Sequence, residues 1–227
     1  MKLNLFLSEW TKSYKQELEK VPMFNIDLTK NWSINQKKKF AKAFQHIRGH
    51  CAEFFWHVGS FSSSSSIKKI ILNNIEEEFG YHKNQSKYSH SELYNLFMNE
   101  FGCDIFDEIG YHSTYLDFIR KFNQDHLKWL SMHNYDYKFA TFSAYEKLDN
   151  LDYEKLYQLA KSLEPKNKES LIFFEVHFKV NHFENTSDVL IDIWEKNNLV
   201  VIESFDFIAK KQISIWSQLS DLIFSES

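Results

Sequence analysis

Long segments with apolar residues at helical spacing, bounded by capping residues and glycines, constrain the fold of this chain more than any other feature. Ser33 with Gln36, and Ser89 with Glu92, have the spacing of capping boxes at helix starts. Only five glycines and two prolines occur in 227 residues, whereas β-sandwiches and barrels need many turn residues. The sequence therefore predicts an all-α fold, a multi-helix bundle.

The predicted helices follow one another with short connections and no domain linker. Gly59 is expected to end one helix, the serine run 62–66 to form a loop, and Ser66 to cap the next helix. We expect residues 1–227 to form a single domain, in which residues 1–20 are a peripheral N-terminal helix. The predicted helices cover residues 6–20, 34–58, 67–79, 92–101, 112–132, 137–148, 151–163, 171–185, 187–197 and 201–223.

Composition excludes several classes of function. The net charge is −4 with acidic and basic residues interspersed, which gives no reason to expect a nucleic-acid partner. No apolar run approaches the length of a membrane span, and the N-terminus is too charged for a signal peptide. Cys51 and Cys103 lie in separate predicted helices and form no CxxC motif. We therefore expect a cytoplasmic protein without a membrane or nucleic-acid partner.

The segment 171–185, LIFFEVHFKVNHFEN, combines an apolar character with several metal-ligating side chains. On a continuous helix, His177, Asn181 and Glu184 fall at positions i, i+4 and i+7 and share one face. His182 is five residues after His177 and points elsewhere. A buried imidazole, amide and carboxylate are costly unless they bind something, and a metal ion is the simplest candidate. The alternative is a helix end with hydrogen-bonded polar groups.

Further candidate ligands are scattered along the chain. Glu76, Glu77 and Glu78 end a predicted helix, where the helix dipole disfavours acidic groups, so one of them is expected to have a specific partner. His90 lies in the first turn of a capped helix, and Glu146 lies in an apolar context. Taken singly, each of these residues is interpreted as structural. A competing stripe, which could present metal ligands or be a polar edge of the bundle, consists of His46, His50, Glu53 and His57.

Four motifs, taken in order, resemble the heme-oxygenase-like di-iron oxidases, a family also described as iron-containing redox enzymes that includes the chlamydial CADD-like proteins. The motifs are NNIEEEFG, SHSELYNLFMNEFG, AYEKLDNLDYEKL and FFEVHFKVNHFEN, and the resemblance covers about residues 20–223. It implies a heme-oxygenase-like bundle, related in fold to thiaminase II and the pyrroloquinoline-quinone synthase C protein. The metal ligands that it implies are Glu78, His90, Glu146 and His177.

The last motif departs from the family pattern. Asn181 stands at the family's Asp position and Glu184 at its second His position, and both are expected to complete the site as oxygen ligands. The resemblance implies two Fe(II) ions, or one Fe or Mn if the second site is lost. The expected function is O2-dependent oxidation of a small organic substrate, and a homodimer is one expected assembly.

Two alternative functions remain open at this point. The first is a metal-free enzyme of the same fold, of the thiaminase II or quinone-synthase type, motivated by the two changed positions. Thiaminase II-like chemistry would need a reactive thiol, for which Cys51 and Cys103 are the only candidates. The second is a non-enzymatic interaction protein, in which exposed aromatic residues would form the binding surface.

Overall fold

The computed structural model describes residues 2–49, 51–80, 88–111 and 115–225, and these ranges contain helices and loops but no strand. The all-α prediction is confirmed. No helix within these ranges is long and apolar enough to cross a membrane. The α-helices are α1 (Leu3–Leu18), α2 (Ile26–Thr29), α3 (Ile34–Arg48), α4 (Cys51–Ser60), α5 (Ser65–Glu78), α6 (His90–Glu100), α7 (Ile105–Tyr111), α8 (Asp117–Met132), α9 (Tyr135–Ser162), α10 (Ile172–Lys179), α11 (Ser187–Lys196) and α12 (Asn198–Phe224). Three 3₁₀ helices, η1 (Pro22–Phe24), η2 (Lys168–Leu171) and η3 (His182–Thr186), lie between them.

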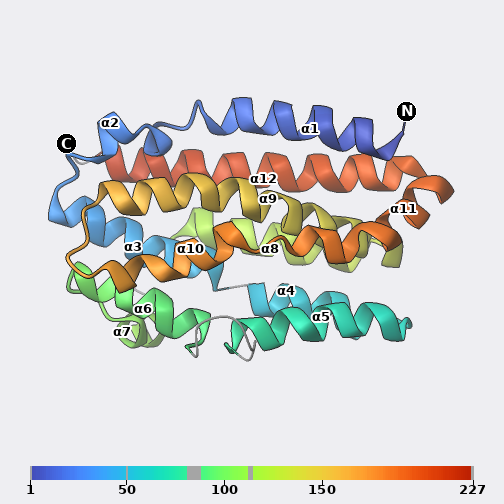
Figure 1. Ribbon diagram of the computed structural model, residues 1–227, viewed down its shortest axis with the longest axis horizontal. Coiled ribbons are helices and arrows are strands. Elements are labelled where there is room, and N and C mark those ends of the chain that lie inside the picture. Colours follow the sequence, from blue (N-terminus) through green and yellow to red (C-terminus); the bar gives the residue numbers. More distant parts are fainter. Residues whose placement is uncertain (1, 50, 81–87, 112–114, 226–227) are drawn as a thin grey trace.

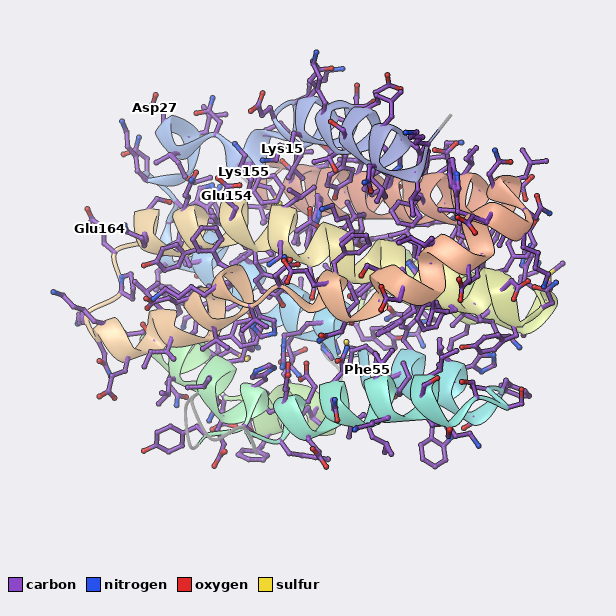
Figure 2. All side chains as sticks on the ribbon, turned by 45° about the vertical axis from the view of Figure 1, so that its right-hand side comes forward. Lys15, Asp27, Phe55, Glu154, Lys155 and Glu164 are labelled. Carbon is purple, nitrogen blue, oxygen red and sulfur yellow. The ribbon has the colours of Figure 1, made fainter. Side chains whose placement is uncertain are left out.

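The two longest helices, α9 and α12, form the centre of the bundle and pack along each other. In Figure 1, α1 lies on the outer side of α12, while α4 and α5 form the opposite edge of the molecule. The Tyr14 hydroxyl of α1 donates a 2.6 Å hydrogen bond to Asp152 of α9. An exposed ion pair of 3.8 Å between Lys15 and Glu154 joins the same two helices (Figure 2). The N-terminal helix is therefore attached to the centre through a buried polar contact as well as through apolar side chains.

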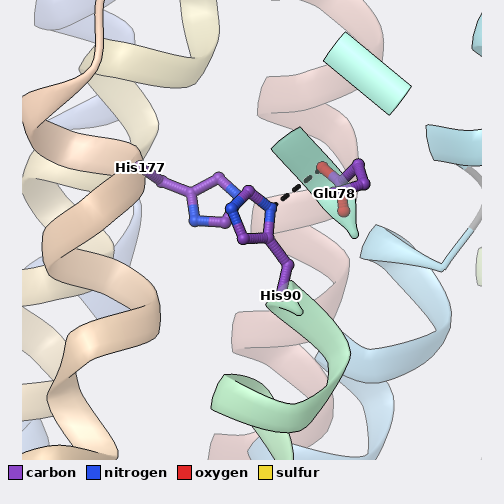
Figure 3. A group of neighbouring side chains, drawn as sticks. All are labelled: Glu78, His90 and His177. Carbon is purple, nitrogen blue, oxygen red and sulfur yellow. Dashed lines mark ion pairs between the residues drawn. The ribbon is translucent and has the colours of Figure 1, made fainter. Parts of the chain in front are cut away.

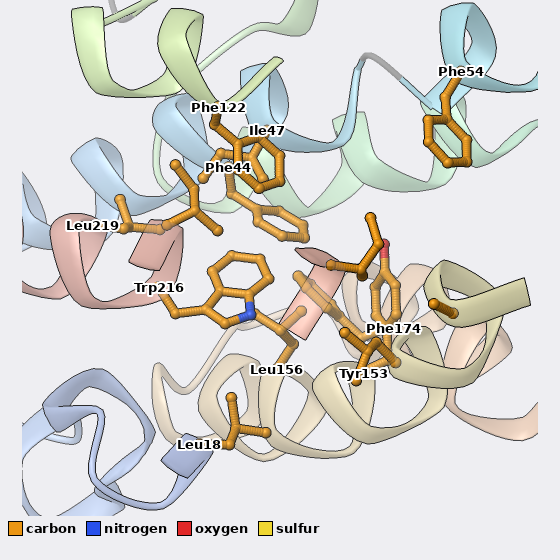
Figure 4. Packing of buried hydrophobic residues seen from close by; sticks show 14 of the residues in the cluster. Leu18, Phe44, Ile47, Phe54, Phe122, Tyr153, Leu156, Phe174, Trp216 and Leu219 are labelled. Carbon is orange, nitrogen blue, oxygen red and sulfur yellow. The ribbon is translucent and has the colours of Figure 1, made fainter. Parts of the chain in front are cut away.

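Large aromatic rings fill the space between α3, α9, α10 and α12. Phe44 of α3 lies at the middle of this core, and its ring is 5.9 Å from Trp216 and 6.1 Å from Phe174 (Figure 4). It also lies 5.6 Å from the ring of Tyr94 and 6.5 Å from that of Tyr153. Aromatic pairs at such separations contribute about 0.5–1.5 kcal/mol beyond the burial of their area. Many of the 22 phenylalanines thus build a core of interlocking rings, whereas Phe61, Phe79, Phe106 and Phe178 are exposed.

Both predicted capping boxes are confirmed. Ser33 accepts from the backbone N–H of Gln36, and Ser89 accepts from that of Glu92, with the reciprocal side-chain contacts present. The predicted cap of α5 is wrong by two residues, since Ser64 and not Ser66 precedes the helix.

Three further predictions about helix limits are also wrong. The expected helix 34–58 is divided into α3 and α4, and Gly59 does not end α4, which continues to Ser60. A Cβ on Gly59 would lie 3.2 Å from Ile71 Cγ2, so this glycine serves close packing of α4 on α5. The two helices expected over 137–148 and 151–163 are one helix, α9. Asp149 and Asn150 have the polarity of a loop, but tertiary contacts hold them in the helix.

Candidate metal centre

Glu78 and His90 are brought together by a turn that requires glycine. Glu78 is the last residue of α5, and Gly80 follows with a φ of +75°. A Cβ at Gly80 would lie 2.6 Å from the carbonyl oxygen of Tyr88, closer than any side chain tolerates. The chain therefore returns directly beside the end of α5. Ser89 then caps α6, which places His90 in its first turn, opposite Glu78.

His177 approaches the same point from α10. Its Nδ1 donates a 2.8 Å hydrogen bond to the carbonyl oxygen of Phe173, because a carbonyl can only accept. This contact fixes the tautomer and leaves Nε2 with a free lone pair, as in most metal-ligating histidines. The imidazole also stacks on Tyr153 of α9, with ring centroids 4.3 Å apart and planes 20° apart. The orientation of His177 is thus set by both its own helix and α9.

The three side chains converge in one place (Figure 3). His90 Nδ1 lies 3.1 Å from Glu78 Oε1, and the rings of His90 and His177 have centroids 4.3 Å apart. One potential ligand atom of each residue lies within 4.8 Å of the other two. Ligands of a common ion lie about 2.0–2.2 Å from it and hence up to about 4 Å from one another. The observed spacing needs only small side-chain movements to fit one ion.

A buried nitrogen supports the fit of a metal. His90 is 6% exposed, and its Nδ1 lies 3.1 Å from Glu78 Oε1 without the geometry of a hydrogen bond. A buried nitrogen whose hydrogen bond is not well made is destabilising unless another group satisfies it. An ion between His90, Glu78 and His177 would satisfy this nitrogen, and one carboxylate with two imidazoles is a donor set that suits Fe(II).

The protonation states in the cluster also suit a cation. Burial alone would raise the pKa of Glu78, but contact with His90 lowers it to about 2. Burial and the neighbouring His90 lower the pKa of His177 well below its usual value. At neutral pH, Glu78 is therefore an anion and His177 a neutral imidazole, the two forms that bind metal.

Glu146 of α9 faces the same region from another side. It is 3% exposed, and Asn74 of α5 donates a 2.7 Å hydrogen bond to its Oε1. A cavity of about 20 Å³, enough for about one water molecule, is lined by Glu146 together with all three clustered residues. Burial and the charges of Asp149, Glu77 and Glu78 raise the pKa of Glu146. The acidic groups around this cavity therefore repel one another unless a cation lies among them.

The sequence-predicted ligands thus fall into two groups. Glu78, His90, Glu146 and His177 line one cavity. Asn181 and Glu184 do not line it: both are exposed, and the Asn181 amide donates a 2.8 Å hydrogen bond to Glu184.

The helical face expected for Asn181 and Glu184 is absent because α10 ends early. The helix stops at Lys179, and Val180 is extended with a ψ of 135°. The Asn150 amide of α9 donates a hydrogen bond to the Val180 carbonyl, and this tertiary contact competes with continued helix. The expectation of one continuous helix over 171–185 is therefore wrong. The side chain of His182 lies outside the described part of the chain.

The competing stripe of His46, His50, Glu53 and His57 does not lie on one face of one helix, because α3 ends at Arg48 and a separate helix, α4, begins at Cys51. His46 Nε2 contacts Glu108 of α7 at 2.9 Å, within a buried charged group that also includes Lys42 at 3.3 Å from Glu108. His57 lies near the other end of α4, with its ring 4.8 Å from that of Phe61. His50 falls outside the described residues. His46 and Glu53 line one larger cleft, but among the described residues the members of the stripe form no group of three potential metal ligands.

One acidic residue of the cavity is not indicated by the sequence, and a second is indicated only in part. Asp149 lies one helical turn after Glu146 on α9 and lines the cavity, whereas the predicted helices 137–148 and 151–163 leave it outside both. Only a continuous α9 places Glu146 and Asp149 on one face. Glu77 also lines the cavity, and it belongs to the three adjacent glutamates of which one is expected to have a specific partner.

Neither cysteine has the surroundings of an activated thiol. Cys51 lines the same cavity, and burial together with Glu78, Asp149 and Glu146 raises its pKa well above the usual value. Burial also raises the pKa of Cys103. Reactive cysteines have lowered pKa values, so these thiols do not favour thiolate chemistry of the thiaminase II kind.

Comparison with known proteins gives one family. No match is found among curated proteins. Residues 38–183 match the family described as iron-containing redox enzymes, and this range includes all four residues that meet at the cavity. The chain belongs to the iron-containing redox enzymes, a family of heme-oxygenase-like helical proteins.

Proposed function

We propose that this protein is a non-heme iron enzyme that uses O2 to oxidise a small organic substrate. The observation that carries the proposal is the convergence of Glu78, His90 and His177 from three helices, with one ligand atom of each within 4.8 Å of the others. Two imidazoles and one carboxylate on a single ion leave coordination positions open, which is the arrangement of non-heme Fe(II) oxygenases. Family membership agrees with iron as the metal.

A second iron position is proposed beside the first. Glu146 and Asp149 present two carboxylates one turn apart on α9, and Glu77 lines the same cavity. Carboxylates suit a second Fe(II) and could also bridge two ions. Asn74, which donates to Glu146, would hold that carboxylate in a fixed orientation. Asn181 and Glu184 are not included, because both are exposed and bound to each other.

The chemistry that iron supplies in such a site is the activation of O2 for oxidation of an organic molecule. The chain's own residues hold the ligands in place and restrict the space around them. The Phe173 carbonyl keeps the proton of His177 on Nδ1, so that Nε2 is available to the metal. Tyr153 stacks on the same imidazole and limits its rotation. The surrounding aromatic core excludes bulk water from the ligands on the side of α9 and α10.

The proposal is tested by loading the purified protein with Fe(II) under anaerobic conditions and measuring bound iron and absorbance before and after O2 is admitted. We expect about two iron ions per chain and an O2-dependent absorbance change. His177→Ala should lose most of the bound iron. His133→Ala is the matched control, because His133 makes the same Nδ1 contact to the carbonyl four residues earlier, on α8. Less than about one iron per ten chains in the unmodified protein would contradict the proposal.

A further inference from the structure

A larger cleft adjoins the metal cavity and shares Glu78 with it. Its volume is about 570 Å³, within the usual range for sites that bind small molecules. Phe55, Ile75, Phe79 and Ile109 give it an apolar wall, and Arg48 lies in the wall as well. A molecule bound in this cleft would therefore lie directly beside the proposed metal ligand Glu78.

Arg48, the last residue of α3, is held rigidly at this cleft. Its guanidinium carbon lies 5.0 Å from the ring centre of Tyr94 and 4.8 Å from that of Phe173, and both rings are fully buried. Nη1 donates a 2.9 Å hydrogen bond to the side-chain oxygen of Gln45, which is 6% exposed. Cation–π contacts with two rings and one amide contact hold the guanidinium in place without using most of its five N–H donors.

The charge of Arg48 has no acidic partner in the part of the chain that the structure describes: no carboxylate there lies within ion-pair distance of it. His46 and Lys42, which lie on the same helix, both contact Glu108 instead. A half-buried guanidinium is costly when it is unpaired, so a residue of this kind indicates an anionic ligand. Arg48 lowers the pKa of Glu78 only as a minor cause, and a metal ion on Glu78 would remove that role.

We propose that Arg48 binds a carboxylate of the substrate, so that the substrate class is small organic acids with an apolar body. This inference rests on the proposed function, since it assigns the substrate of that metal centre. The guanidinium fork matches a carboxylate through two parallel hydrogen bonds. One arginine compensates one negative charge, which favours a carboxylate over a doubly charged phosphate. The apolar body would lie along Phe55 and Ile75, towards Glu78.

The test measures binding by calorimetry with three acids of different length, acetate, 3-phenylpropionate and octanoate, and with their neutral amides. The iron-loaded protein is kept anaerobic, and the metal-free protein is measured in parallel. We expect at least one acid to bind about tenfold or more tightly than its amide. In Arg48→Met that acid should lose at least about tenfold in affinity while its amide is unchanged, and Arg48→Lys should be intermediate because it lacks the fork. Lys161→Met, which removes an exposed cation lying over Tyr157, is the control and should bind like the unmodified protein.

Several results would overturn the inference. One is that no acid binds more tightly than its amide. Another is that the acid binds to Arg48→Met within about twofold of its affinity for the unmodified protein. A third is that phenyl phosphate binds more tightly than all three acids. Thermal unfolding separates binding from structure: without ligand, removal of the unpaired charge should offset the lost contacts with Gln45 and the two rings, so Arg48→Met should melt within about 3 °C of the unmodified protein. A larger drop in melting temperature would indicate a structural role instead. Iron content is read independently, so loss of iron with retained acid binding would contradict only the metal proposal.

Discussion

Replacing Asp152 with asparagine should flatten the dependence of stability on pH. Asp152 is 1% exposed and accepts hydrogen bonds from Tyr14, from Trp216 at 2.9 Å and from Gln212 at 3.3 Å. Burial raises its pKa from 3.8 to about 7, although the contacts with Tyr14 and Trp216 act in the opposite direction. The folded protein therefore prefers the protonated carboxyl, whereas the unfolded chain ionises near its ordinary pKa.

The direction and the size of the effect follow from this difference. Because the folded pKa is raised, the stability linked to Asp152 is complete below pH 3.8 and is lost as the pH rises through about 7. One pKa unit corresponds to about 1.4 kcal/mol, so the full effect is about 4 kcal/mol, of which about 2 kcal/mol falls between about pH 5.5 and pH 8.

Urea unfolding of both proteins at pH 5.5 and pH 8 measures the effect. The free energy of unfolding of the unmodified protein, minus that of Asp152→Asn, should fall by about 2 kcal/mol between the two pH values. Asp27→Asn is the control, since the exposed Asp27 pairs with Lys30, which lowers its pKa, and it should not titrate in this range. A difference that stays constant within about 0.5 kcal/mol would refute the assigned pKa of Asp152.

Two further predictions concern the proposed metal centre. Glu146→Gln keeps an oxygen for Asn74 but removes a buried ionisable group, whose pKa burial raises well above its usual value. This change should lower the iron content to about one ion per chain and raise the melting temperature of the metal-free protein, as shown by metal analysis and calorimetry. Gly80→Ala should destabilise the protein by about 1–3 kcal/mol and reduce iron binding, because the new Cβ would lie 2.6 Å from the carbonyl oxygen of Tyr88. Gly110→Ala is the control, since its Cβ would have no atom within 4 Å, and it should change neither the free energy of unfolding nor the iron content. Denaturation and metal analysis of both variants measure these effects.

The fold could be predicted because its signals are local. The capping boxes depend only on neighbouring positions, and the all-α prediction depends on composition as well. The structure confirms both. Errors arose where tertiary contacts override local preference. Asp149 and Asn150 look like a loop, yet they lie inside α9, and Gly59 looks like a helix end, yet it serves packing against Ile71.

The candidate site could be predicted only in part, for a related reason. Helical spacing alone placed His177, Asn181 and Glu184 on one face, but only His177 lines the cavity. The hydrogen bond from Asn150 of α9 to the carbonyl of Val180, the residue after α10, cannot be predicted from the spacing of residues within one segment. Only the family resemblance predicts that Glu78, His90 and Glu146 belong to one site. These residues lie far apart in the sequence, and no single segment indicates that they come together in the fold.

The acidic residues of the cavity explain why α9, as well as α10, would contribute to the metal affinity. α9 packs against both α12 and α10, so Glu146 and Asp149 keep fixed positions one turn apart. α10 contributes one imidazole and then ends, and the polar residues beyond it bond to each other at the surface. Four acidic groups line one small cavity, and burial together with the charges of neighbouring acids raises the pKa of Glu146 and of Asp149 well above the usual values. A divalent cation among them would stabilise their ionised forms. The groups that destabilise the metal-free protein are therefore the same groups that would bind iron, and the stability of the fold should rise with metal occupancy.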